Sequence, residues 1–100
     1  MPSRRVVFSN LARQDLHAIG VEGDSSWGRI RSRSYLRAIR DAAHRLPDFP
    51  EMHPLLENSV AELRKARSGS HLLIYRITPE QIEIIRVLHE RMDAADQLGI

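Results

Sequence analysis

The stretch that decides the fold is Gln81-Ile82-Glu83-Ile84-Ile85-Arg86-Val87-Leu88, which runs directly into His89-Glu90-Arg91-Met92-Asp93. The first part is rich in β-branched residues and predicts a strand, and the second is a compact polar cluster where that strand should end. Because side chains alternate along a strand, both faces of this one should be covered. One face is expected to carry Ile82, Ile84 and Leu88, and the other Ile85 and Val87.

Arg86 interrupts this apolar pattern. A cation within a buried strand costs free energy unless it is paired or reaches the surface. We therefore expect Arg86 to form an ion pair with Asp93 or Glu83, or else to lie at an open edge.

Two segments upstream complete a sheet around this strand. His71–Ile77 is a strong strand, and Thr78-Pro79-Glu80 makes the turn after it, with proline well placed to preset the turn angle. Residues 60–67 alternate weakly and precede a turn at Ser68-Gly69-Ser70. The C-terminal half thus predicts a three-stranded antiparallel meander.

The N-terminal half predicts a strand followed by a helical hairpin. Val6-Val7-Phe8 suits a strand, and Ser9 is a helix N-cap because its hydroxyl can accept from free amides of the first turn. The first helix is expected to be short and to stop at Gly20 and Gly23.

The second helix of the hairpin is expected from Trp27 to about Leu46, capped by Asp24-Ser25-Ser26 and ended by Pro47. Trp27 should anchor the turn between the helices as part of the core, with a partner-facing role as the alternative. Neither helix can bury its apolar stripe alone.

The predicted fold class is α+β: an N-terminal strand and antiparallel helical hairpin packed on a mostly antiparallel sheet with a C-terminal three-stranded meander. One hundred residues, 42% of them apolar, suit one domain over residues 1–100 with one modest core. Residues 48–58 should form an ordered connection, and residues 94–100 a helical turn or a loose tail.

The composition excludes several classes of protein. The chain has no cysteine, so neither a disulfide framework nor a thiolate metal site can form. The N-terminus lacks a signal-peptide core, and no apolar run approaches a membrane span, so we expect a cytoplasmic protein without membrane contact. No two of the five histidines are spaced for chelation on a helix face, and we expect no metal, no cofactor and no catalytic residue.

The formal net charge of +2 is too small to indicate nucleic-acid binding by itself. Much of the positive excess lies in the arginines between Arg29 and Arg45. These are expected to point in several directions on a helix, which favours a solvated polar face over a stripe that tracks phosphates. His89 is expected to be satisfied by the nearby carboxylate of Asp93.

The order of elements and particular residues resemble the ParE branch of the RelE/ParE toxin superfamily, over nearly the whole chain. The most specific match is the closing strand, Ile84-Ile85-Arg86-Val87-Leu88-His89 with Arg91-Met92-Asp93. Further matches are Phe8-Ser9, Ala12, residues 15–19, Trp27-Gly28, Tyr35, Leu46 before Pro47, Leu63-Arg64 and residues 74–77.

This resemblance implies the toxin half of a type II toxin–antitoxin pair, neutralised in a hetero-oligomer by a small ParD-like antitoxin. ParE-like toxins poison DNA gyrase, which halts replication and growth. The partner-binding surface implied here comprises Arg64, Tyr75, Arg86, His89, Arg91, Met92 and Asp93. An acidic antitoxin tail would add a helix or a strand opposite these arginines.

The RelE branch of the superfamily suggests the alternative function, a ribosome-dependent mRNA endoribonuclease. Where that branch places an Arg in the third strand, a C-terminal Arg and a terminal Tyr, this chain has Leu72, Met92 and Leu98, although Lys65 fits one basic position. Cleavage through the 2′-hydroxyl needs groups that take and give a proton and cations for the phosphorane. His89 as base, with Arg91 and Arg64 on phosphate, keeps this alternative open.

Overall fold

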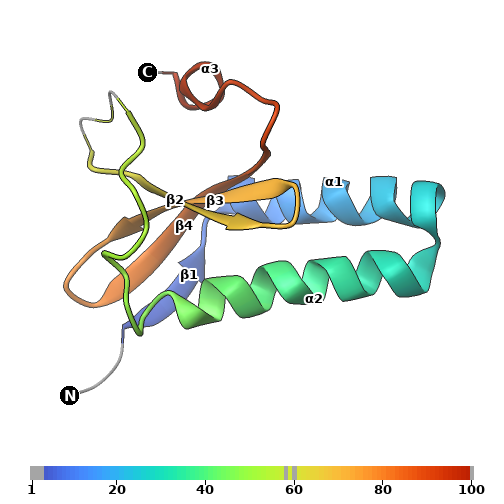
Figure 1. The fold of residues 1–100 in the computed structure, drawn as a ribbon, viewed down its shortest axis with the longest axis horizontal. Helices are drawn as coiled ribbons and strands as arrows, with labels where there is room; N and C mark the ends of the chain where they lie inside the picture. Colours follow the sequence, from blue (N-terminus) through green and yellow to red (C-terminus); the bar gives the residue numbers. More distant parts are fainter. Residues whose placement is uncertain (1–3, 58, 60, 100) are drawn as a thin grey trace.

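The computed structural model describes residues 4–57, 59 and 61–99, and its elements form two layers (Figure 1). In chain order the elements are β1 (Arg5–Phe8), α1 (Asn10–Trp27), α2 (Arg29–Arg45), β2 (Arg64–Ser68), β3 (His71–Ile77), β4 (Gln81–His89) and α3 (Ala94–Leu98). The sheet order is β1-β4-β3-β2, with β1 parallel to β4 and the other neighbours antiparallel. The predicted α+β fold and the C-terminal meander are therefore confirmed.

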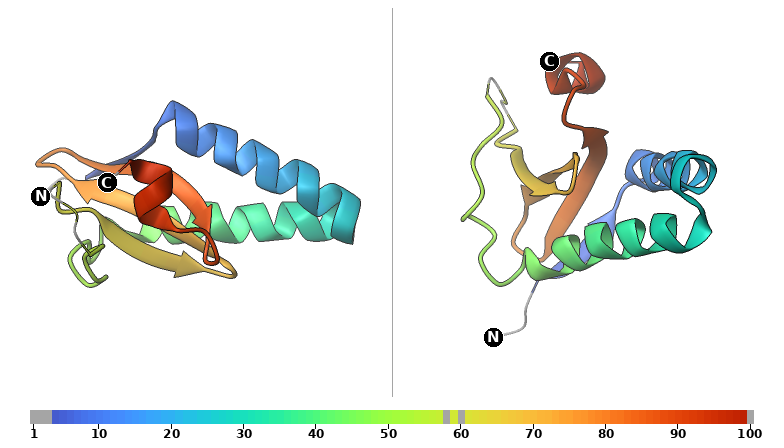
Figure 2. Two further views of the ribbon diagram at one scale, coloured as in Figure 1. Left: turned by 90° about the horizontal axis from the view of Figure 1, so that it is seen from above. Right: turned by 45° about the vertical axis from the view of Figure 1, so that its right-hand side comes forward.

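Helices α1 and α2 cover one face of the sheet, whereas α3 lies toward the other (Figure 2), where Leu56 and Leu63 of the connection between α2 and β2 also pack. The main core lies under the two helices, where Leu16 and Ile39 pack with Leu73, Tyr75 and Ile84. A smaller apolar cluster on the far face joins Leu63, Ile74 and Leu88, with Leu56, Leu72, Ile85, Ala94 and Leu98 packed against it.

Strand β4 departs from the expected alternation at a β-bulge. Ile74 pairs with Arg86 while Tyr75 pairs with Ile84, so Ile85 is the extra residue. Val87 therefore packs with the helix-side core and Leu88 with the far cluster. Both faces of β4 are covered as predicted, but the predicted grouping of residues on each face is wrong beyond the bulge.

Helix α1 is longer than predicted, because it continues through Gly20 and Gly23 to Trp27. Gly23 is buried against α2, where an added Cβ would lie 2.6 Å from Oγ of Ser32. The Ser32 hydroxyl in turn donates to the carbonyl of Gly20 at 3.1 Å. These two glycines allow the helices to approach closely, so the prediction that they stop the helix is wrong.

The helical hairpin turns at the single residue Gly28, whose φ of 87° favours glycine. The predicted cap at residues 24–26 is wrong, since these residues lie inside α1 and α2 begins at Arg29 without a side-chain cap. Trp27 is 49% exposed and packs edge-on against Tyr35, so it flanks the turn without entering the core. α2 ends at Arg45, ahead of Pro47 as predicted.

The connection between α2 and β2 is ordered over its described residues, as predicted. The Tyr75 hydroxyl donates to the carbonyl of Pro50 at 2.6 Å, and the Leu56 amide donates to the carbonyl of Leu63 at 2.7 Å. β2 begins at Arg64, later than predicted. Asn58, Val60 and Ile100, which the predicted segments included, lie outside the described residues.

Candidate partner-binding groove

A groove of about 370 Å³ opens between α1, the β2–β3 turn and the end of β4. Its lining includes Asp15, Glu22, Trp27, His71, His89 and Met92, and we call it the α1–β4 groove. Arg86, His89 and Met92, three residues of the predicted partner-binding set, line this groove. Its walls come from segments far apart in the sequence, so its geometry depends on how α1 is fixed to β4.

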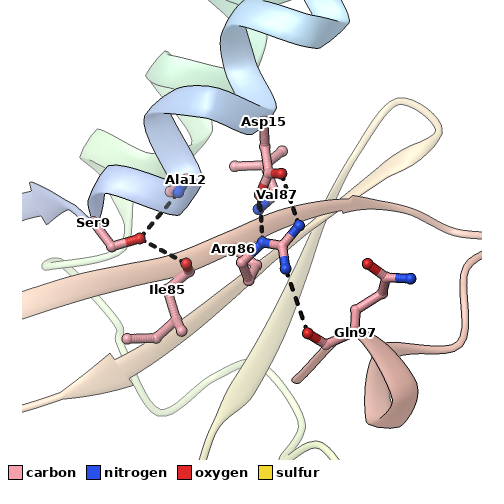
Figure 3. Close-up of polar contacts among 7 residues, drawn as sticks. All are labelled: Ser9, Ala12, Asp15, Ile85, Arg86, Val87 and Gln97. Carbon is pink, nitrogen blue, oxygen red and sulfur yellow. Dashed lines mark hydrogen bonds and ion pairs between the residues drawn. The ribbon is translucent and has the colours of Figure 1, made fainter. Parts of the chain in front are cut away.

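Asp15 fixes α1 to β4 through three hydrogen bonds. Its carboxylate accepts from Nε and Nη2 of Arg86 at 2.8 and 2.9 Å, and from the backbone amide of Val87 at 2.9 Å (Figure 3). Both side chains of the ion pair are largely buried, with about 15% of each exposed. The pairing with Asp93 or Glu83 predicted for Arg86 is therefore wrong.

The Asp15–Arg86 ion pair lies beside the part of β4 that extends beyond the end of β1. β1 pairs with β4 only as far as Phe8 opposite Ile84, which leaves the following β4 backbone without a neighbouring strand on that side. Ser9 and Asp15 supply the hydrogen bonds that a neighbouring strand would make to β4. The Ser9 hydroxyl donates to the Ile85 carbonyl at 2.7 Å and also caps α1 by accepting from the Ala12 amide (Figure 3). The edge of β4 is thus satisfied by side chains from α1 and its cap.

Arg86 remains a cation in this setting. Hydrogen bonding to the Asp15 carboxylate raises the pKa of Arg86 above its ordinary value, and this effect outweighs the opposing effect of burial. Nη1 of Arg86 also reaches the carbonyl of Gln97 in α3 at 3.4 Å (Figure 3). Arg86 therefore links α1, β4 and α3, and its charge is neutralised locally by Asp15.

The opposite wall of the groove is a row of aromatic polar side chains. Oη of Tyr35 lies 2.6 Å from Nδ1 of His71 and accepts from the Ser70 amide at 3.0 Å. His71 and His89 are partners on neighbouring strands, and their rings meet edge to face with centroids 5.2 Å apart. Burial, followed by the proximity of His89, lowers the pKa of His71 below 6.5.

The turn after β4 forms the rim of the groove. Nδ1 of His89 accepts from the Arg91 amide at 3.0 Å, and the carboxylate of Asp93 caps α3 by accepting from the Ala95 amide at 3.0 Å. The expected pairing of His89 with Asp93 is therefore wrong, since Asp93 is used by the helix that follows it. Met92 is 49% exposed at this rim.

Two residues of the predicted set lie elsewhere. Nη1 of Arg64 donates to the carbonyls of Glu51 at 3.2 Å and His53 at 2.7 Å. Tyr75 is fully buried, and burial raises its pKa. Both residues hold the connection against the sheet, and Tyr75 presents no surface to a partner in this structure.

Comparison with known proteins identifies the family of this chain. The family model described as the ParE toxin of the type II toxin–antitoxin system, parDE, matches residues 6–94. The chain belongs to the ParE toxin family. Toxin ParE1 of Caulobacter vibrioides is 35% identical over 92 residues, which cover 92% of this chain and 95% of that protein. Toxin ParE1 of Mycobacterium tuberculosis is also 35% identical over 92 residues, covering 91% and 94%.

Solved structures share the fold of this ParE-family toxin. A chain of the chromosomal ParDE toxin–antitoxin system from P. aeruginosa has a TM-score of 0.74 at 16% identity, covering 87% of this chain and 96% of that one. A chain of the RelBE2 toxin–antitoxin complex from Mycobacterium tuberculosis has a TM-score of 0.63 at 29% identity, covering 88% and 99%. The predicted resemblance to the ParE branch is confirmed.

Two of the three positions that matter for the RelE alternative are apolar and packed in this ParE-family chain, whereas the third, Met92, is half exposed. Leu72 and Leu98 both lie against the far-face cluster around Ile74 and Leu88. Among the described residues, no three His, Cys, Asp or Glu side chains are placed to hold a metal ion. No helix within the described ranges has the length and apolar character needed to cross a bilayer.

Proposed function

We propose that this toxin acts in the cytoplasm by binding and inhibiting DNA gyrase, and that a cognate ParD-like antitoxin silences it. The observation that carries this proposal is the packing of Leu72 and Leu98 into the far-face cluster, where RNA-cleaving relatives require polar groups. Aliphatic side chains neither transfer a proton nor stabilise a phosphorane. Inhibition by binding to another macromolecule needs no proton-transfer group, and the groove with its rim can provide the contact surface.

The α1–β4 groove is the proposed contact surface. Its frame is fixed by the Asp15–Arg86 pair, so little conformational freedom would be lost when a partner binds. Its rim offers half-exposed Trp27 and Met92 beside the imidazole of His89. Large apolar and aromatic side chains around a concave surface are typical of binding sites.

The antitoxin would be an acidic partner that forms a hetero-oligomer with this chain. The support is family membership and the solved relatives from ParDE and RelBE2 toxin–antitoxin systems. The exposed guanidinium of Arg91, next to the groove, would steer an acidic tail toward the rim. Such charge pairing speeds encounter and sets register more than it adds affinity.

A gyrase supercoiling assay with purified toxin tests the proposed target. We expect inhibition of supercoiling and trapping of cleaved DNA, and we expect both to be weakened in a His89→Ala, Met92→Ala variant. Arg76→Gln is the control, because Arg76 is paired with Glu83 at 2.5 Å and does not line the groove. Unaffected supercoiling with no cleavage complex, using folded toxin, would refute the proposal.

The endoribonuclease alternative is favoured by one observation, the contact between His71 and His89 in a groove that also holds Arg86. Two imidazoles near a cation could exchange a proton with RNA. Translating ribosomes incubated with the toxin would then yield messenger cuts that disappear in Arg91→Ala and His89→Gln variants. Intact messenger alongside gyrase inhibition would exclude this alternative.

A further inference from the structure

Helix α2 carries a linear array of cations on one flank. It holds six arginines and one aspartate in 17 residues. At 3.6 residues per turn, Arg29, Arg33, Arg37, Arg40 and His44 fall within an arc of about 80°, and we call these five residues the α2 stripe. All five are exposed. The prediction that the arginines point in several directions holds only for Arg31 and Arg45, which fall on the opposite flank.

The stripe is not neutralised within the described part of the chain. The ion pairs found there use Arg67, Arg76 and Arg86, and none uses an arginine of α2. Arg13 and His17 of α1 extend the basic surface, because they line a shallow hollow together with Arg40. Asp24 in the same hollow and Asp41 on α2 are the acidic neighbours.

We propose that the α2 stripe binds the sugar–phosphate backbone of duplex DNA without regard to sequence. From Arg29 to His44 the helix rises about 22 Å, with a cation every 4 to 6 Å. Double-stranded DNA carries one phosphate per about 1.7 Å of helix axis, counting both strands, so a stripe of this length would lie opposite several phosphates. Arginine suits this contact because its planar donors match phosphate oxygens.

The composition of the flank favours duplex DNA over other polyanions. Proteins that bind single strands stack bases on aromatic residues, whereas Tyr35, the one Tyr, Trp or Phe of α2, is hydrogen-bonded to His71 of β3. Membrane insertion would need an exposed apolar face, but Ile39 and Ala43 are buried in the core. Between Arg33 and His44 the flank exposes no large apolar anchor of the kind that protein interfaces use.

This activity goes beyond the proposed function and uses a different surface. The α1–β4 groove is lined from α1 by Asp15, Ala18, Ile19 and Glu22, whereas the hollow beside the stripe is lined by Arg13, His17 and Asp24. The two surfaces share none of their α1 residues. A partner in the groove would therefore leave the part of the stripe near Arg40 free, and the toxin would be held on the DNA where a topoisomerase works.

The test measures binding of purified toxin to a labelled 20-base-pair duplex by fluorescence anisotropy at a series of salt concentrations. The variant is Arg33→Gln, Arg37→Gln in the stripe, and the matched control is Arg31→Gln, Arg45→Gln on the opposite flank. Both pairs lie on exposed positions of α2 and remove the same charge. Glutamine keeps helix propensity close to that of arginine, and circular dichroism would verify the fold.

We expect the stripe variant to reduce the slope of log K against log salt by about 1.8, since each phosphate contact contributes about 0.9. The control should keep the wild-type slope to within about half a unit, and an equal-length single strand should bind more weakly than the duplex. Equal reductions of the slope in the two variants would show that DNA binding depends only on the net charge of the protein, and would overturn the proposal. Absence of duplex binding at low salt, or tighter binding of the single strand, would also overturn it, whatever the gyrase assay shows.

Discussion

The two walls of the α1–β4 groove are built from different residue types and do different work. On the inner wall, Asp15 accepts three hydrogen bonds and neutralises Arg86 in largely buried surroundings. On the opposite side, Met92 is half exposed and His89 is partly exposed. The ion pair of Asp15 with Arg86, whose pKa is raised, therefore supports the fold. The rim, which makes fewer internal contacts, is the surface available for binding.

The largest effect is expected from Asp15→Ala. The substitution leaves the Arg86 guanidinium without its counter-ion and the Val87 amide without its acceptor, and breaking a largely buried pair in this way costs about 3 kcal/mol. We expect a loss of that size in the free energy of unfolding, measured by urea denaturation. Asp15→Asn should lose less, because an amide oxygen can still accept from Val87. A loss below about 1 kcal/mol in Asp15→Ala would show that the inner wall is not structural support.

Gly23→Ala tests the same wall where α1 meets α2. The added methyl group would lie 2.6 Å from Oγ and 3.1 Å from Cβ of Ser32, so the helices must separate or Ser32 must move. Overpacking of this kind costs about 1–3 kcal/mol, and we expect about 2 kcal/mol by thermal or urea unfolding. In the double variant with Ser32→Gly, most of this loss should be recovered. Equal losses in the single and double variants would place the strain elsewhere.

The sequence predicted the sheet well because its signals are local. Alternation in His71–Ile77 and Gln81–Leu88 and the proline turn between them specify neighbouring strands and their order. The β-bulge at Ile85 was not predicted, since one extra residue leaves no mark in a run that is apolar on both faces. The consequence is that His71 lies opposite His89, where the turn alone would place it opposite Leu88.

The candidate site was only partly predictable, because its contacts are long-range. Asp15 and Arg86 are 71 residues apart, and both Glu83 and Asp93 were closer carboxylates in the sequence. Gly23 was misread because glycine both ends helices and lets them approach closely, and only the position of Ser32 distinguishes the two. Tyr35 and Glu22 reach the groove from the helical hairpin; Tyr35 matched the family pattern without indicating a place in a groove, and no motif in the sequence marks Glu22.

A smaller effect is expected from pH, through His71. Its pKa is lowered in the folded chain by burial and by His89, against the opposing influence of Glu22, Asp15 and Glu90. The unfolded chain therefore binds more protons below the ordinary pKa of 6.5, so this contribution to stability is complete above that pH and is lost as pH falls through the lowered pKa. Urea unfolding at pH 7.5 and pH 5 measures the loss.

The control for this pH effect is His71→Asn, which keeps an acceptor for the Tyr35 hydroxyl but does not titrate. We expect the variant to lose less stability than the wild type on going from pH 7.5 to pH 5. The comparison of the two pH dependences removes the contribution of the other histidines, which both proteins share. Identical pH dependences would mean that His71 is as easily protonated in the folded chain as in the unfolded one.

The smallest effect on stability is expected at the rim, with Met92→Ala. Met92 is half exposed and packs in neither apolar cluster, so its truncation should change the free energy of unfolding by less than about 0.5 kcal/mol. If the rim is where a partner binds, the same truncation should weaken gyrase inhibition or antitoxin binding by a clearly measurable factor, because exposed apolar side chains contribute most when they become buried in an interface. Asp15→Ala should lose much more stability than Met92→Ala, and any weaker binding at temperatures where the variant stays folded should follow from the loosened frame of the groove. A Met92→Ala variant that is destabilised as strongly as Asp15→Ala would remove the distinction between the two walls, since both would then support the fold.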